Sequence, residues 1–115
     1  MTQLLGRAQA EGGLVIAPAV YAELLAHPGA SVQFVDEFLI STRIAIDFDL
    51  GESVWRDAGS RFAVYAERRR RSGGGNSKRL LVDFLIGAHA ISKADRLLTL
   101  DASRYREDFP KLQLM

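Results

Sequence analysis

The segment from Arg79 to Ile91, RLLVDFLIGAHAI, constrains the fold of this chain more than any other stretch. Its residues are almost all apolar or small, which predicts a helix too apolar to lie on a protein surface. A single carboxylate, Asp83, lies inside it. Burying a charge costs several kcal/mol unless the charge is paired or bound to a cation. The fold must therefore bury this helix and give Asp83 a partner.

Helix and strand signals alternate along the rest of the chain. Buried strands are expected at LVIAP, RIAIDFD, RLLTLD and LQLM. Helices are expected at TQLLGRAQA, at AVYAELLAH, at VQFVDEFLIST with Ser31 as its N-cap, from Glu52 to Arg71, from Arg79 onward, and at ASRYRED. Such alternation favours a parallel sheet covered by helices on both faces. We therefore expect one α/β domain over residues 1–115, with three α/β/α layers.

Composition excludes several classes of protein. The 115 residues include no cysteine, which excludes a disulfide framework and a thiolate metal site. No apolar stretch approaches the roughly 20 residues that a membrane span requires, and the first residues do not follow the plan of a signal peptide. We expect a soluble, cytoplasmic protein that makes no contact with membranes.

A dense basic segment surrounds the glycine-rich sequence SGGGNS, although the net charge of the whole chain is only +1. A local cluster of this kind can attract phosphate groups. Its other interpretation is a solvated loop without a ligand. The candidates for nucleic-acid contact are Arg68, Arg69, Arg70, Arg71, Lys78 and Arg79.

Three acids occupy positions where an open parallel sheet binds its ligands, outside the carboxyl ends of the strands. Glu23 follows the first strand, Asp101 ends the third, and Asp83 lies in the helix that leads into that third strand. Converging carboxylates repel one another unless a cation lies between them, and oxygen ligands suit Mg²⁺ or Mn²⁺. Each acid also has a simpler interpretation: Asp83 or Asp101 as a helix cap, Glu23 as an exposed helix residue.

Three segments together resemble a PIN domain of the VapC toxin type: LVIAPAVYAELLA, RRRRSGGGNSKRLLVDFLIGAHA and RLLTLDASRYREDFPKLQL. The resemblance implies a three-layer fold and a metal-dependent endoribonuclease, the toxin of a toxin–antitoxin pair. It matches Glu23, Asp83 and Asp101 to catalytic residues that bind Mg²⁺ or Mn²⁺. It also implies RNA and a cognate antitoxin as partners, with the basic segment as the RNA-binding surface.

One part of the family pattern is missing from this sequence. PIN domains begin with a central strand that ends in a metal-binding Asp, whereas the only acid before Leu14 is Glu11, at the end of a helix. We therefore expect a PIN-like fold that lacks its first central strand, with weakened activity. A strand from a second copy or from a partner would fill the gap, which favours a homodimer, unless the natural protein carries the strand ahead of the residues given. The alternative is a non-catalytic PIN remnant that binds RNA or an antitoxin.

Overall fold

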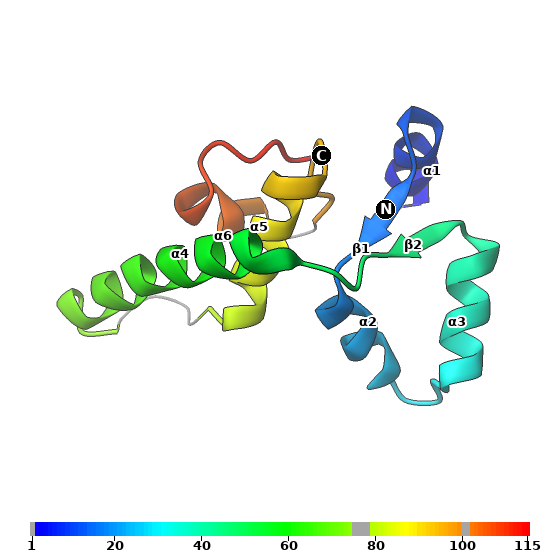
Figure 1. The fold of residues 1–115 in the computed structure, drawn as a ribbon, viewed down its shortest axis with the longest axis horizontal. Coiled ribbons are helices and arrows are strands. Elements are labelled where there is room, and N and C mark those ends of the chain that lie inside the picture. The colour runs from blue at the N-terminus through cyan, green and yellow to red at the C-terminus, as the bar shows by residue number, and fades with distance from the viewer. Residues whose placement is uncertain (1, 75–78, 100–101) are drawn as a thin grey trace. The chain divides into compact units, whose positions relative to one another are not determined.

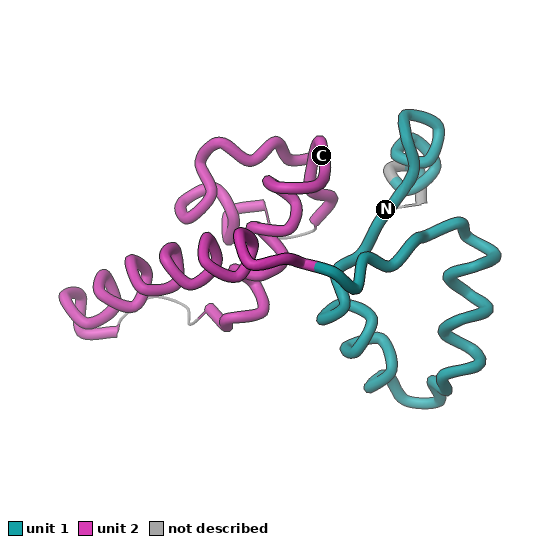
Figure 2. Tube along the Cα trace, viewed as in Figure 1, with its two compact units in different colours: residues 1–49 teal, residues 50–115 magenta. Residues whose placement is uncertain are grey.

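The structure of the protein is a computed structural model that describes residues 2–74, 79–99 and 102–115. The chain forms two compact units, Met1–Asp49 and Leu50–Met115 (Figure 2). It is mixed α/β, mostly helical, with a small two-stranded parallel sheet (Figure 1). The α/β class and the parallel pairing are thus confirmed. The three-layer arrangement and the single domain stay predictions.

The first unit contains the sheet and three helices. Strands β1 (Leu14–Ile16) and β2 (Ile44–Ile46) pair in parallel, with Val15 opposite Ala45. The helices are α1 (Thr2–Glu11), α2 (Pro18–Leu25) and α3 (Val32–Ser41). Each helix lies where the sequence predicts one, and the first two predicted strands are confirmed.

Local sequence signals set the ends of these helices. Gly13, just beyond α1, has a φ of 99°, a conformation that glycine adopts at no steric cost. Pro18 opens α2, where its missing N–H has no partner to lose. The Ser31 hydroxyl accepts a hydrogen bond of 3.1 Å from the Phe34 N–H, which confirms Ser31 as the N-cap of α3.

The second unit contains α4 (Gly51–Arg71), α5 (Leu81–Lys93) and α6 (Ala102–Asp108). The helix expected from Arg79 begins two residues later, because Leu80 is extended and the Arg79 N–H donates to the Tyr65 hydroxyl at 2.6 Å. Within the described residues, the strands expected at RLLTLD and LQLM are reduced to one parallel bridge, Leu97 to Leu114. Residues 100–101 of the former lie outside the described part.

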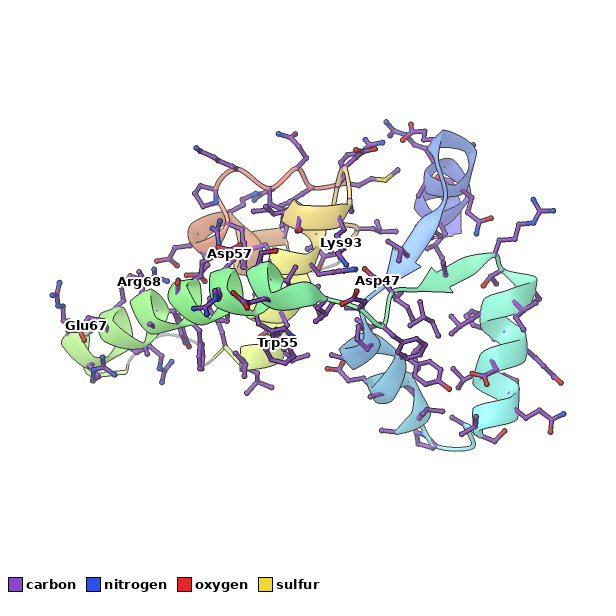
Figure 3. The ribbon with its side chains drawn as sticks, in the orientation of Figure 1. Asp47, Trp55, Asp57, Glu67, Arg68 and Lys93 are labelled. Carbon is purple, nitrogen blue, oxygen red and sulfur yellow. The ribbon has the colours of Figure 1, made fainter. Side chains whose placement is uncertain are left out.

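An aromatic cluster forms the core of the second unit. Phe84 on α5 lies at its centre, with its ring centroid 5.2 Å from Phe62, 5.5 Å from Tyr65 and 6.0 Å from Phe109. Helix α4 therefore buries the face predicted from its apolar spacing. The helical spacing of Val54, Trp55, Ala58, Phe62 and Tyr65 predicts that all five lie near this face. The side chain of Trp55, on the first turns of α4, is nevertheless exposed (Figure 3).

Candidate functional site

Asp83 is buried near the start of α5, with 8% of its surface exposed. Its Oδ2 accepts a hydrogen bond of 3.0 Å from the Leu80 N–H, which would otherwise lack a partner within the helix. Its Oδ1 lies 3.2 Å from Nη1 of Arg104 on α6. The negative charge also faces the positive end of the helix dipole. The carboxylate is thus stabilised by the backbone, by the helix and by a cation from the same unit.

This geometry confirms the capping interpretation of Asp83. One carboxylate oxygen satisfies the helix start, and the other forms an ion pair, so the buried charge has the partner that its cost demands. Metal binding by Asp83 remains a prediction. Its Oδ1 already contacts Arg104, so a metal ion would have to compete with the guanidinium for this oxygen.

Of the other two candidate ligands, the structure describes Glu23 but not Asp101. Glu23 is exposed on α2, in the first unit. Asp101 lies outside the described residues. Among the described residues, no group of three or more His, Asp or Glu side chains gathers in a way that could hold a metal ion. Convergence of Glu23, Asp83 and Asp101 therefore stays a prediction.

The chemistry of the three acids still fits Mg²⁺ or Mn²⁺. Carboxylate oxygens are the ligands these hard cations prefer, and Asp83 points one oxygen toward a cationic group already. The position of the Arg104 guanidinium marks a place where positive charge is stabilised. That Glu23, Asp83 and Asp101 together hold such an ion stays a prediction, which rests on the resemblance to PIN domains.

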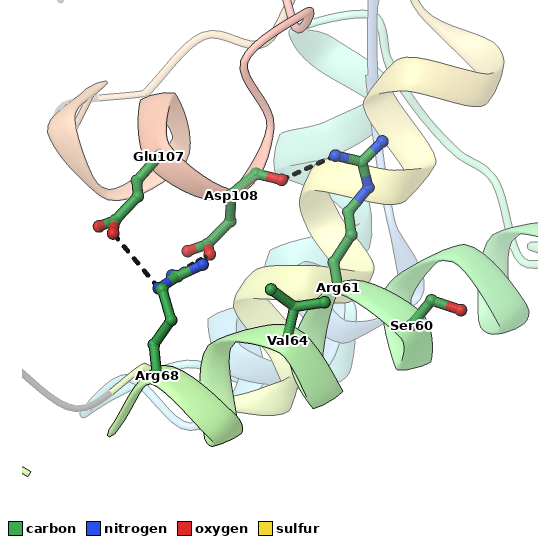
Figure 4. A pocket seen from close by; sticks show the side chains of 6 residues that line it. All are labelled: Ser60, Arg61, Val64, Arg68, Glu107 and Asp108. Carbon is green, nitrogen blue, oxygen red and sulfur yellow. Dashed lines mark hydrogen bonds and ion pairs between the residues drawn. The ribbon is translucent and has the colours of Figure 1, made fainter. Parts of the chain in front are cut away.

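Two members of the basic segment hold the C-terminal helix in place. Arg68, on the last turns of α4, contacts Asp108 at 2.5 Å and Glu107 at 3.3 Å (Figure 4). Arg79, just before α5, contacts the other oxygen of Asp108 at 3.2 Å. The Asp108 side chain is only 2% exposed, so these arginines neutralise a buried charge.

The other arginines of the basic segment, Arg69, Arg70 and Arg71, do not contact Asp108 in any described ion pair or hydrogen bond. Arg70 and Arg71 are mostly exposed, and both contact Glu67 near the end of α4 (Figure 3), at 2.5 and 3.3 Å. Arg69 donates to the Tyr65 hydroxyl and to the Gly74 carbonyl. Lys78 lies outside the described residues. Arg70 and Arg71 are therefore the members most open to an external phosphate, and RNA binding by the segment stays a prediction.

A hollow of about 250 Å³ lies beside these ion pairs, between α4 and α6 (Figure 4). Arg61 crosses it, donating to the Asp108 carbonyl at 2.7 Å and to Asp57 at 2.9 Å. The hydrogen bond to Asp108 raises the pKa of the Arg68 guanidinium above its ordinary value. Two acids, Glu107 and Asp108, line the hollow together with two arginines, Arg61 and Arg68, so the charges of its lining balance. It lacks the excess positive charge of a phosphate site.

Three residues singled out in the sequence serve the packing of the second unit. A Cβ atom added to Gly87 would lie 2.5 Å from Phe109 Cε2, so glycine lets the aromatic ring approach the α5 backbone. The helical spacing of Tyr105 and Phe109 in the sequence favours core packing of Tyr105 over stacking on a base, and Tyr105 is indeed buried beside Phe109. His89 is buried in α5 as well, consistent with a structural histidine.

Sequence reasoning missed Arg104 and Asp108. Their partners lie 21 and 40 residues away along the chain, beyond any helical or strand period. The one available signal was the apolar setting of Asp83, which requires a cationic partner without indicating which residue provides it.

In comparisons with known proteins, no protein-family model, no curated protein and no solved structure matches this chain. In the described part of the chain, none of the helices has both the length and the apolar character that crossing a lipid bilayer requires.

Proposed function

We propose that this protein is a metal-dependent endoribonuclease of the PIN type, acting as the toxin of a toxin–antitoxin pair. The observation that carries the proposal is Asp83, a carboxylate buried at the start of an apolar helix. The resemblance of the three sequence segments to PIN domains supports the same assignment, and it supplies Glu23 and Asp101 as the companions of Asp83.

In this proposal the three acids bind Mg²⁺ or Mn²⁺. Such an ion would activate a water and neutralise charge that develops on a phosphodiester. Glu23, Asp83 and Asp101 hold and orient the ion through their carboxylate oxygens.

The basic segment binds the RNA backbone in this proposal. Arg70 and Arg71 support that role best, since their side chains are 68% and 80% exposed. Their contacts with Glu67 are surface ion pairs, which contribute little and are readily exchanged for a phosphate. Such contacts are independent of sequence and sensitive to salt.

A second candidate is a non-catalytic module that binds RNA or an antitoxin. The ion pair between Asp83 and Arg104 favours it, because the buried charge is already satisfied without a metal. Exposed apolar side chains on α3, Phe34 and Ile40 among them, favour a protein partner. The two candidates differ in whether the chain cuts RNA.

A cleavage assay separates the two candidates. The full chain is incubated with a mixture of structured RNAs, with Mg²⁺ or with EDTA, and compared with Asp83→Asn. The nuclease proposal predicts weak cleavage that requires Mg²⁺ and is lost in the variant. Asp57→Asn serves as the control, since Asp57 forms an ion pair with Arg61 and is not one of the three proposed ligands. RNA binding without cleavage would favour the binding module.

A further inference from the structure

Helix α4 has one face that the core of the second unit does not use. Its other face carries the buried residues of the helix, Val54, Ala58 and Tyr65. The open face has exposed small residues at its middle: Gly59, Ser60 and Ala63. Two larger apolar residues lie at its edges, Trp55 with 54% and Val64 with 58% of their surface exposed. An exposed tryptophan beside small neighbours gives this face apolar surface that a partner can bury.

The spacing of residues on the open face is that of a helix which packs against another helix. Steps of four and three residues alternate along the series Glu52, Arg56, Gly59, Ala63, Ala66 and Arg70. This alternation keeps one seam of a helix facing a partner helix over several turns. Gly59 and Ala63 lie at the middle of the seam, and a Cβ added to Gly59 meets nothing within 4 Å. Two helix backbones can therefore approach closely there.

The charges of the seam match those of a second copy that runs in the opposite direction. The steps read the same from either end, so two antiparallel copies of α4 meet in register about the point between Gly59 and Ala63. Glu52 of one copy then lies opposite Arg70 of the other. Arg56 lies opposite Ala66 of the other copy, beside Glu67. A parallel arrangement would instead place each of these charges against its own kind.

The ion pairs that these residues form within α4 do not prevent such contacts. Arg56 contacts Glu52, and Arg70 contacts Glu67, with at least 47% of each side chain exposed. Surface pairs of this kind contribute little, and a carboxylate can accept hydrogen bonds from two arginines at once. A second copy can therefore add its charges without the loss of a buried interaction.

We propose that the open face of α4 is a self-association surface, on which a second copy of this chain packs its own α4 in the antiparallel direction. The inference does not depend on the proposed nuclease activity, because it requires neither a metal nor RNA. A contact confined to one helix of each copy is at the small end of protein interfaces, so we expect a Kd on the order of 10 μM. Trp55 of each copy lies level with Ala66 and Glu67 of the other and becomes buried.

Trp55 reports on this surface directly, because it is the only tryptophan of the chain. The full chain is diluted through the expected Kd while its fluorescence is recorded, and sedimentation velocity gives the fraction of dimer. We expect the emission maximum to move to longer wavelength with the same midpoint as dissociation. A dimer that dissociates with no change in emission would place its interface elsewhere. A monomer at all concentrations would also overturn the proposal, including one whose Trp55 is covered by the chain itself.

Charge reversal tests the antiparallel register. Glu52→Lys places two like charges opposite each other at both ends of the seam, and so does Arg70→Glu. Each should raise the Kd of the dimer at least about 10-fold, whereas the double variant should return it close to the wild-type value. Arg106→Glu, a reversal at an exposed arginine of α6, is the matched control and should leave the Kd unchanged.

All three positions are exposed, so the variants should fold, and circular dichroism checks that their helix content is kept. Unchanged dimerisation in the two single variants would refute the contact between Glu52 and Arg70. Loss of the dimer in the single variants without recovery in the double variant would refute the antiparallel register.

Discussion

The Nη2 atom of Arg68 lies 2.5 Å from Oδ1 of Asp108, an ion pair that joins the last turns of α4 to the last residue of α6. Arg79 reaches the other oxygen of the same carboxylate from beyond the glycine-rich segment. Arg68 and Arg79 are the first and last members of the basic segment, and both contact Asp108. One buried carboxylate thus ties together both ends of that segment.

Replacing Asp108 with Asn should therefore destabilise the protein. The variant leaves Arg79, which is 16% exposed, and part of Arg68 without a negative partner. Breaking a buried pair in this way costs 3–5 kcal/mol, and the exposure of Arg68 reduces the expected loss to about 2 kcal/mol. Urea unfolding followed by circular dichroism measures the change. Glu107→Gln removes an exposed partner of the same arginine and should cost less than about 1 kcal/mol. Equal losses in the two variants would contradict the buried role of Asp108.

A second prediction concerns the contact between Gly87 and Phe109. In Gly87→Ala the new methyl group would overlap the aromatic ring, and such overpacking costs roughly 1–3 kcal/mol. Gly59→Ala on α4 is the matched control, since a Cβ there meets nothing within 4 Å. It should stabilise the helix by up to about 1 kcal/mol. Thermal unfolding of both variants would show shifts of opposite sign. A stabilised Gly87→Ala would show that α5 and Phe109 are not packed this closely.

The third prediction tests the exposed arginines as RNA contacts. Changing Arg70 and Arg71 together to Gln should weaken RNA binding and reduce the slope of log affinity against log salt by about 1.5, since each phosphate contact to single-stranded RNA contributes roughly 0.7. Fluorescence anisotropy at several salt concentrations provides the slopes. Arg56→Gln removes an arginine of the same helix that also forms an exposed ion pair, with Glu52. An unchanged slope in the double variant would return the segment to its interpretation as a solvated loop.

The fourth prediction concerns pH and the first unit. The Tyr21 hydroxyl donates to Asp36 at 2.8 Å, and this hydrogen bond, with burial and the negative charge as smaller causes, raises the pKa of Tyr21 above 10.0. The unfolded chain loses the tyrosine proton at lower pH than the folded chain does. The stabilisation is therefore complete below pH 10 and is lost as the pH rises through the folded pKa. Carbon-13 labelling of the tyrosine rings reports the titration, and Asp36→Asn should return Tyr21 to a lower pKa. If the pKa of Tyr21 is the same in Asp36→Asn as in the wild type, the hydrogen bond to Asp36 does not cause the shift.

Helix positions were predictable because their signals are local. Ser31 caps α3 as its sequence suggests, and the apolar spacing of α4 and α5 placed both helices within two residues of their observed ends. The start of α5 was missed because Tyr65, from another helix, binds the Arg79 N–H. Trp55 was wrongly predicted to be buried, because helical spacing does not show which edge of an apolar face other elements pack against.

Long-range partners account for what the sequence could not predict. Leu97 and Leu114 form a bridge where two full strands were expected, since short apolar runs do not show how far their pairing extends. For Asp83, the cap three residues away was among the interpretations drawn from sequence, whereas the ion pair with Arg104 depends on how α6 packs against α5. The helix cap formed by Asp83 was thus predictable from the sequence, and its counter-ion was not.

The most direct test of the central claim is the response of the three acids to Mn²⁺. A nitrogen-15-labelled sample is titrated with substoichiometric Mn²⁺, which broadens the amide signals of residues close to the bound ion. We predict that Glu23, Asp83 and Asp101 lose their signals together, ahead of exposed acids such as Glu52 and Glu107. Broadening that affects only one of the three, or that follows the exposed acids, would contradict a shared metal site.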